Sequence, residues 1–248
     1  MLGIGMSTTL IGIILGLFSL MNALGSLVIG YLTDLMDRTR LFTMLSIISG
    51  SLILLMVTGV PIIVSAAYLM SALFNRYVVL TAIVGEYAKQ RGISDEVFSL
   101  SSSFNVIFSV VGSAITVLPS YLGHLGYELI FVIEAAAVYL TIPLVLNAIK
   151  HLDPAIVNAK IERISLKDLG ELRSSWLIKR LMPEAIIGLG AGGVIIPLFS
   201  LWFYLKFHIN IANLSIVYAI SNATLALGTL MAPTISRFLH SRVISVVT

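Results

Sequence analysis

The chain has 248 residues, of which 58% are hydrophobic and 11% charged, whereas a soluble domain is usually about a quarter charged. Basic residues slightly outnumber acidic ones, for a net charge of +3, but they lie between long apolar stretches. This composition excludes a soluble domain, a disordered chain and a nucleic-acid-binding module. Five stretches without Asp, Glu, Lys or Arg reach or exceed the roughly 20 apolar residues that cross a bilayer; they are 1–33, 41–75, 97–127, 185–205 and 207–236.

These stretches predict an all-α integral membrane protein, because a helix satisfies its own backbone hydrogen bonds in lipid. The first helix is expected to begin near Ser7 and to end near Asp34, and Pro61 divides the next apolar stretch into two spans. A polar segment, 150–177, separates the fifth span from the sixth. The seven predicted spans are 7–34, 41–60, 63–88, 97–119, 128–149, 178–205 and 210–236.

The basic residues are distributed unequally between the two sides of the membrane. With seven spans, 13 of the 15 Lys and Arg residues lie on one side, one, Lys206, lies on the other, and Arg76 falls inside a span. Because basic loops stay in the cytoplasm, we expect the segments 34–40, 89–96 and 150–177 and the C-terminus to be cytoplasmic. The N-terminus is then outside, and the chain is predicted to be a multi-pass protein of the cell membrane.

A short internal repeat connects the first and the last span. Residues 23–27 read ALGSL and residues 226–230 read ALGTL, and each copy is followed by a turn that contains arginine. Duplicated halves joined by a polar linker are typical of secondary transporters.

The turn after the first span contains the most informative motif, GYLTDLMDRTR, from Gly30 to Arg40. It resembles the cytoplasmic loop between helices two and three of the major facilitator superfamily. Gly30, Asp34 and Arg40 match the motif of that family, and Arg38 adds a second positive charge. Leu35 stands where a basic residue is usual, and Asp37 where glycine is usual, although Asp can form or cap a tight turn.

The resemblance implies which part of a transporter this chain represents. Residues 182–203 and 94–113 look like the family's helices seven and five, so the predicted spans correspond to helices two to eight of twelve. Residues 1–149 then form the N-terminal half without its first helix, 150–177 the cytoplasmic central linker, and 178–248 the beginning of the C-terminal half. We therefore expect a fragment with an incomplete two-half architecture, which needs the missing helices as partners in order to transport.

The family further implies secondary active transport of a small solute by alternating access, coupled to an ion or a proton. Asp34 would make a charge contact between the two halves that is broken as they rock. The sequence has no ATP-binding loop and no cysteine, so we expect no cofactor, no metal and no enzymatic activity. The expected partners are the bilayer and a small-molecule substrate that the sequence does not identify, with no nucleic acid.

Two charged residues, Arg76 and Glu134, lie well inside predicted spans, whereas Glu86 and Glu184 lie near the cytoplasmic ends of theirs. A charge in a bilayer is costly and usually faces a cavity, a partner or a substrate path. Arg76 and Glu134 are therefore candidates for substrate or proton coupling, and the alternative is a structural ion pair between them. Gly12 and Gly16 are spaced as a small-residue packing pair.

Other kinds of membrane protein fit the sequence less well. A seven-helix sensor agrees with the number of spans, but a retinal protein needs a lysine in its last span, and 207–236 contains none. An intramembrane enzyme would need a catalytic group of His, Asp or Ser side chains inside the spans, whereas the charges clearly inside the spans are Arg76 and Glu134.

Overall fold

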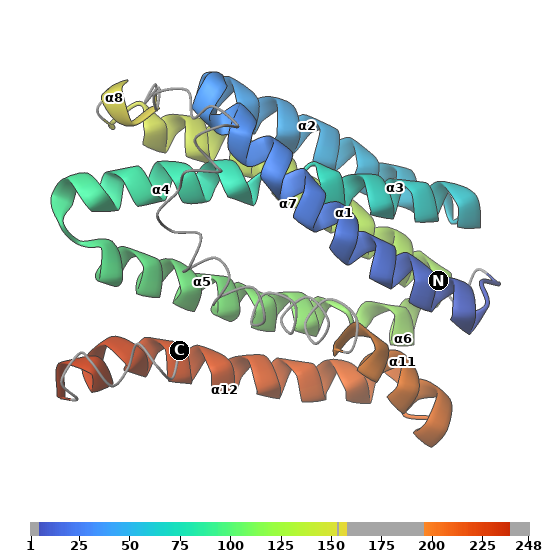
Figure 1. The fold of residues 1–248 in the computed structure, drawn as a ribbon. Helices are drawn as coiled ribbons and strands as arrows, with labels where there is room; N and C mark the ends of the chain where they lie inside the picture. Colours follow the sequence, from blue (N-terminus) through green and yellow to red (C-terminus); the bar gives the residue numbers. More distant parts are fainter. Residues whose placement is uncertain (1–4, 153, 158–195, 239–248) are drawn as a thin grey trace, which may run out of the picture. The chain divides into compact units, whose positions relative to one another are not determined.

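In the computed structural model, the described residues 5–152, 154–157 and 196–238 are built from helices without a β-strand (Figure 1). The helices are α1 (Thr8–Leu35), α2 (Arg38–Leu55), the 3₁₀ helix η2 (Met56–Thr58), α3 (Pro61–Leu73), α4 (Tyr77–Arg91), α5 (Ser94–Ile115), α6 (Leu118–Leu122), α7 (His124–Ile149), α8 (Pro154–Val157), α11 (Ile196–Phe207) and α12 (Ile211–Phe238).

Six segments among the described residues are long and apolar enough to cross a membrane. They are Thr8–Leu35, Arg38–Thr58, Pro61–Arg91, Glu96–Leu122, His124–Ile149 and Ala212–Met231. The segments correspond to six of the seven predicted spans and confirm the all-α membrane fold. Most of the other predicted span, 178–205, lies outside the described residues, which include only α11 from this part of the chain.

Local capping chemistry explains the start of the first span and the boundary between the second and third spans. The Ser7 hydroxyl accepts a hydrogen bond from the Leu10 amide at 3.3 Å, which is the geometry of a helix N-cap. Gly59 has a φ of 64°, and this left-handed conformation ends the second span before Pro61 occupies the first turn of α3. Pro61 therefore divides the two spans as predicted.

The third span differs from the prediction, because it is interrupted in its middle. The sequence predicts one helix from about residue 63 to residue 88, whereas α3 ends at Leu73 and α4 begins at Tyr77. The Asn75 side chain accepts a hydrogen bond from the Tyr77 amide at 3.1 Å and so caps the second helix. The break places three residues without helical structure inside a segment that is apolar enough to span a membrane.

Close packing divides the described residues into two compact units, and each is described by itself. The first unit contains the described residues within Met1–Ile83 and Phe131–Phe207, and the second those within Val84–Ile130 and His208–Thr248.

In the first unit, α1 and α3 are in close contact at Gly25. A Cβ atom at this glycine would lie 2.5 Å from the carbonyl oxygen of Leu73 and 2.6 Å from its Cα, so only glycine fits. Further along the same face of α1, the rings of Phe18 and Tyr68 stack with their centroids 4.3 Å apart. Gly12 and Gly16 do not form the predicted packing pair, since no described atom lies within 4 Å of a Cβ built at either.

A second glycine brings α2 close to α7 within the first unit. A Cβ atom at Gly50 would lie 2.8 Å from the ring of Tyr139, whose hydroxyl makes a 3.0 Å hydrogen bond with Ser51. Beside this contact, Ile53 packs against Ala135 and Val138. The two glycine contacts hold α1, α3, α2 and α7 around a common interior.

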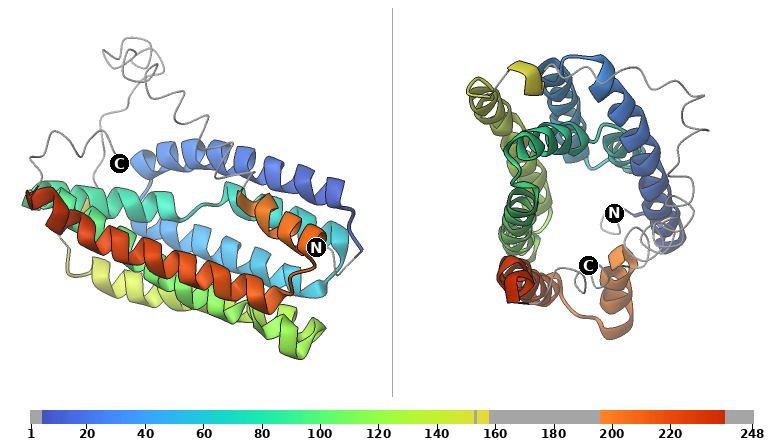
Figure 2. Two further views of the ribbon diagram at one scale, coloured as in Figure 1. Left: turned by 90° about the horizontal axis from the view of Figure 1, so that it is seen from below. Right: turned by 60° about the vertical axis from the view of Figure 1, so that its left-hand side comes forward.

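In the second unit, α5 and α12 lie side by side (Figures 1 and 2). Two pairs of polar side chains connect them. The Asn222 amide donates to the Ser113 hydroxyl at 3.0 Å, and the hydroxyls of Thr116 and Ser215 lie 2.8 Å apart. Such interhelical hydrogen bonds are a usual means of joining helices in lipid.

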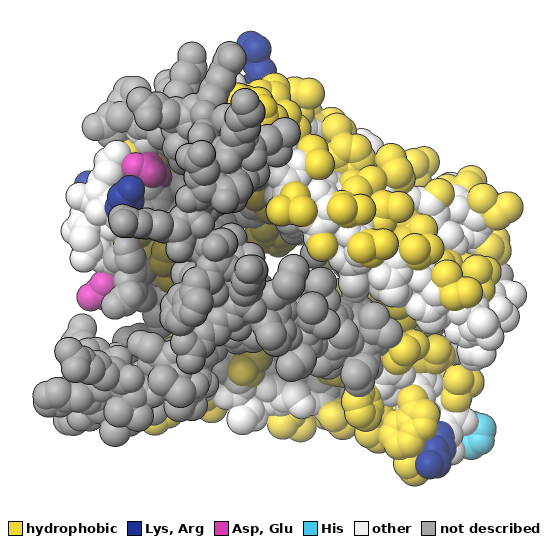
Figure 3. Space-filling model, in the orientation of Figure 1, with side chains coloured by type: hydrophobic (Ala, Val, Ile, Leu, Met, Phe, Trp, Pro, Cys, Tyr) yellow, Lys and Arg dark blue, Asp and Glu magenta, His cyan; other side chains and the backbone are white. Residues whose placement is uncertain are grey.

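The outward surface of the helices is apolar, as a lipid-facing surface must be. On α1, for example, Leu27 is 74% exposed and Val28 is 59% exposed. Hydrophobic side chains predominate over the parts of α1, α2 and α3 that Figure 3 shows. In water such a surface would favour aggregation, whereas in a bilayer it is the ordinary outer face of a helix.

Candidate functional site

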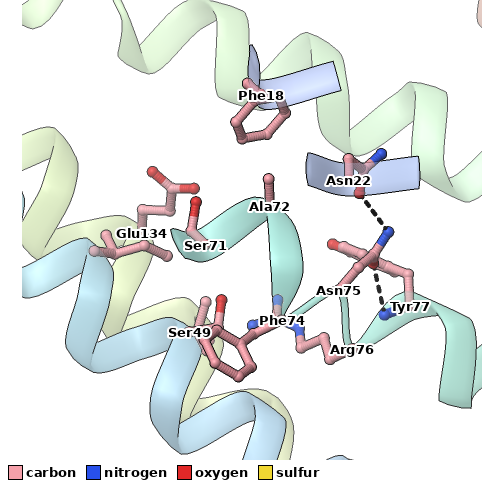
Figure 4. Close-up of a pocket in the computed structure, with 12 residues that line it drawn as sticks. Phe18, Asn22, Ser49, Ser71, Ala72, Phe74, Asn75, Arg76, Tyr77 and Glu134 are labelled. Carbon is pink, nitrogen blue, oxygen red and sulfur yellow. Dashed lines mark hydrogen bonds between the residues drawn. The ribbon is translucent and has the colours of Figure 1, made fainter. Parts of the chain in front are cut away.

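A cavity of about 260 Å³ lies inside the first unit, at the break between α3 and α4. Residues from α1, α2, α3, α7 and the first residue of α4 surround it together with the three residues of the break. The lining residues are Phe18, Asn22, Ser49, Ile53, Ser71, Ala72, Phe74, Asn75, Arg76, Tyr77, Glu134 and Val138 (Figure 4). The lining therefore combines apolar walls with a few polar groups, which is typical of small-molecule sites.

The break is held in place by a pair of amide side chains. Asn75 donates from Nδ2 to the Oδ1 atom of Asn22 on α1 at 3.0 Å, while its own Oδ1 atom accepts from the Tyr77 amide. One asparagine thus fixes the start of α4 and ties it to α1. Both asparagines are partly buried, so these bonds also satisfy polar groups within an apolar segment.

The two charged residues singled out from the sequence line this same cavity. Arg76 belongs to the break and is partly buried, and its Cζ atom lies 5.3 Å from the centre of the Tyr77 ring. Glu134 comes from α7 and lies on the Ser71 side of the cavity, whereas the Asn22–Asn75 pair lies on the other side (Figure 4). Among the described residues the one ion pair is His124–Glu128, so no salt bridge joins Arg76 to Glu134.

The loop motif lies elsewhere, at the turn between α1 and α2, and none of its residues lines the cavity. Gly30 is within α1, and Asp34 is half-buried near the end of this helix. Asp37 caps α2, because its Oδ1 atom accepts a hydrogen bond from the Arg40 amide at 2.7 Å. The expected ability of Asp to cap the turn in place of glycine is confirmed, and φ is negative at both Met36 and Asp37.

The two arginines of the motif have different environments. Arg38 is 2% exposed, and its Nη1 atom donates to the Ile156 carbonyl oxygen at 2.9 Å, a contact across 118 residues of sequence. Its Nε atom is buried without a hydrogen-bond partner. Arg40, by contrast, is exposed. Arg38 therefore attaches α8, the short helix after the fifth predicted span, to the loop motif.

Sequence reasoning missed the role of Asn75. An asparagine next to an arginine inside an apolar stretch was the available signal. The described residues contain no group of three or more His, Cys, Asp or Glu side chains that could hold a metal ion.

Six candidate spans and a charged cavity at an interrupted span define a polytopic membrane protein with an internal polar site. The family model described as Major Facilitator Superfamily matches residues 1–248, the full length of the chain. The chain therefore belongs to the major facilitator superfamily, a family of membrane transporters, as its loop motif predicted. No curated protein and no solved structure was found to match it.

Proposed function

We propose that the chain acts in secondary active transport of a small solute across the cell membrane, by alternating access and with coupling to an ion or a proton. The observation that carries this proposal is the cavity at the break between α3 and α4, where Arg76 and Glu134 face a common space. Discontinuous spans with charged groups near the break are a recurring way to build solute sites in transporters. In this proposal Arg76 and Glu134 take part in substrate binding or coupling.

The loop motif has the conformational role in this proposal. Gly30, Asp34, Arg38 and Arg40 lie at the cytoplasmic end of α1 and α2, with residues 150–177 as the central linker between halves 1–149 and 178–248. Because the chain resembles helices two to eight of a twelve-helix transporter, we propose that it transports only together with the remaining helices as partners.

Uptake into proteoliposomes tests the function. The chain is reconstituted alone and together with the remaining helices of a twelve-helix protein, and labelled solutes are supplied with and without an imposed proton gradient. We expect saturable uptake that the gradient stimulates and that Arg76→Gln abolishes, only when the other helices are present. Uptake by the chain alone would contradict the need for partners, and absence of uptake in both preparations would contradict the transport function.

The proposed orientation has its own test, because the chain contains no cysteine that would interfere with labelling. Single cysteines replace Met36, which is 38% exposed at the proposed cytoplasmic turn, and Tyr121, which is 79% exposed at the proposed outer end. In intact cells, a membrane-impermeant maleimide should label Tyr121→Cys and not Met36→Cys. The reverse pattern would overturn the orientation.

A further inference from the structure

The cavity has two unlike ends, and this polarity indicates what kind of solute fits it. Arg76 is in the break, directly before the first residue of α4, and Glu134 lies on the side of Ser71, in the last turn of α3 (Figure 4). A helix carries partial positive charge at its N-terminus and partial negative charge at its C-terminus. The N-terminus of α4 therefore adds to the positive charge of Arg76, and Glu134 supplies a negative charge on the Ser71 side.

The two charged side chains have no salt-bridge partner within the described part of the chain. Glu134 makes no hydrogen bond there either, and the Arg76 guanidinium lies 5.3 Å from the centre of the Tyr77 ring. The two charges attract each other, but over more than the distance of a salt bridge. The neighbouring polar groups are already engaged: Asn75 bonds to Asn22 and to the Tyr77 amide, and the Ser71 hydroxyl donates to the Tyr68 carbonyl at 2.7 Å. Neither charge is therefore neutralised by a direct contact, and a solute between them can pair with both.

A solute with both charges satisfies this arrangement better than a solute with one. A singly charged ion would pair with either Arg76 or Glu134 and leave the other charge without a partner in an apolar region, which is costly. A cavity of about 260 Å³ is also smaller than the roughly 300–1,000 Å³ of sites for drug-sized molecules. Phe18 and Ile53 provide apolar surface in the cavity that a small hydrocarbon group of the solute can contact.

We propose that the solute is a small zwitterion of the α-amino acid type, whose carboxylate binds at Arg76 and whose ammonium group binds at Glu134. This assignment rests on the proposed function and specifies its substrate class. The carboxylate accepts hydrogen bonds from the guanidinium group at the start of α4, and the ammonium group donates to the Glu134 carboxylate. No proton or electron transfer is needed for binding.

Equilibrium binding to the full chain in lipid nanodiscs tests the proposal without requiring transport. The probes are the common L-amino acids, each compared with its amide, which keeps only the ammonium charge, and its N-acetyl derivative, which keeps only the carboxylate. Glucose serves as a neutral solute. At least one amino acid should bind with a Kd at least tenfold lower than either of its derivatives, and this comparison uses only the unaltered chain.

Substitutions then assign the two ends of the zwitterion. In Arg76→Gln the preferred amino acid should bind no better than its amide, and in Glu134→Gln no better than its N-acetyl derivative, each after a loss of at least tenfold. Arg91→Gln, at the other end of α4, and Glu128→Gln, on the same helix as Glu134, remove the same charges outside the cavity and should leave binding unchanged. The crossed pattern would overturn the assignment of the ends.

The outcomes separate this proposal from the proposed function. Equal affinity for an amino acid and both of its derivatives would overturn the zwitterion assignment. So would a site that binds only glucose or only a singly charged derivative, if Arg76→Gln or Glu134→Gln weakens that binding. Each of these results leaves the transport function in place. If no probe binds and no solute is taken up in the proteoliposome assay, both proposals fail.

Discussion

The two copies of the Ala-Leu-Gly repeat occupy different environments in the two compact units. In the first unit, Gly25 lies directly against the backbone of Leu73, whereas no described atom lies within 4 Å of a Cβ built at Gly228 in the second unit. The contact face of α12 includes Ser215, Asn222 and Ala226, and Gly228 follows two residues later, on another side of the helix. A sequence repeat therefore does not ensure that the same residue makes the helix contact.

Polar residues also serve different purposes in the two units. In the second unit, Asn222 and Thr116 bond to side chains of the neighbouring helix and join α5 to α12. In the first unit, Asn22 and Asn75 bond to each other but leave Arg76 and Glu134 facing an open cavity. The polar side chains of the second unit therefore join two helices, whereas those of the first unit also line the cavity of the candidate site.

The largest expected change in the free energy of unfolding comes from adding a methyl group at Gly25, in the closely packed first copy of the repeat. Gly25→Ala should lower the free energy of unfolding by about 3 kcal/mol, because the new Cβ meets backbone atoms that cannot rotate away. Gly228→Ala is the matched control and should be neutral or slightly stabilising. Reversible denaturation in mixed detergent micelles measures both, and equal effects would refute the difference between the copies.

A second contrast lies within the loop motif. Arg38→Ala should lower the free energy of unfolding by about 2 kcal/mol, because it removes a buried charged donor from the Ile156 carbonyl. The exposed Arg40 should tolerate the same substitution. Proteolysis near residues 150–157 provides an independent readout, since α8 loses its attachment in Arg38→Ala alone. Faster cleavage in Arg40→Ala as well would contradict this assignment.

Removal of the cap at the break should affect both stability and binding. Asn75→Ala loses the hydrogen bonds to Asn22 and to the Tyr77 amide, and we expect a loss of about 1 kcal/mol in the free energy of unfolding. Because the cap also positions Arg76, binding of the preferred amino acid should weaken at least tenfold. Unchanged binding in a folded Asn75→Ala protein would show that the cap does not shape the site.

The smallest effect is expected in the second unit. Asn222→Ala removes the bond to Ser113 and should cost about 0.6 kcal/mol, the average for interhelical hydrogen bonds in a membrane protein. Asn105→Ala on α5 is the control, because the described structure shows no hydrogen bond of its side chain. Solute binding should be normal in both, and weakened binding in Asn222→Ala would remove the functional distinction between the units.

Most of the spans could be predicted from the sequence, because their length and ends depend on local features. Charge-free stretches indicate the spans, and Ser7 and Pro61 mark where helices begin. The break at residues 74–76 could not, since hydropathy does not report backbone conformation and no proline or glycine marks this position. The burial of Arg38 depends on a segment 118 residues away, and no local pattern contains that contact. The candidate site was found in part, because a charge within a span is itself a signal, as at Arg76 and Glu134.

The interrupted span has a consequence for how the chain enters the membrane. Residues 61–91 form a single hydrophobic segment by length and composition, so we expect the insertion machinery to treat them as one transmembrane unit. Asn75 at the break donates a hydrogen bond to Asn22 of α1, and this bond forms only when the inserted helices associate. Biogenesis would thus proceed in two stages, with the shape of the cavity acquired during assembly of the helices and not during their insertion.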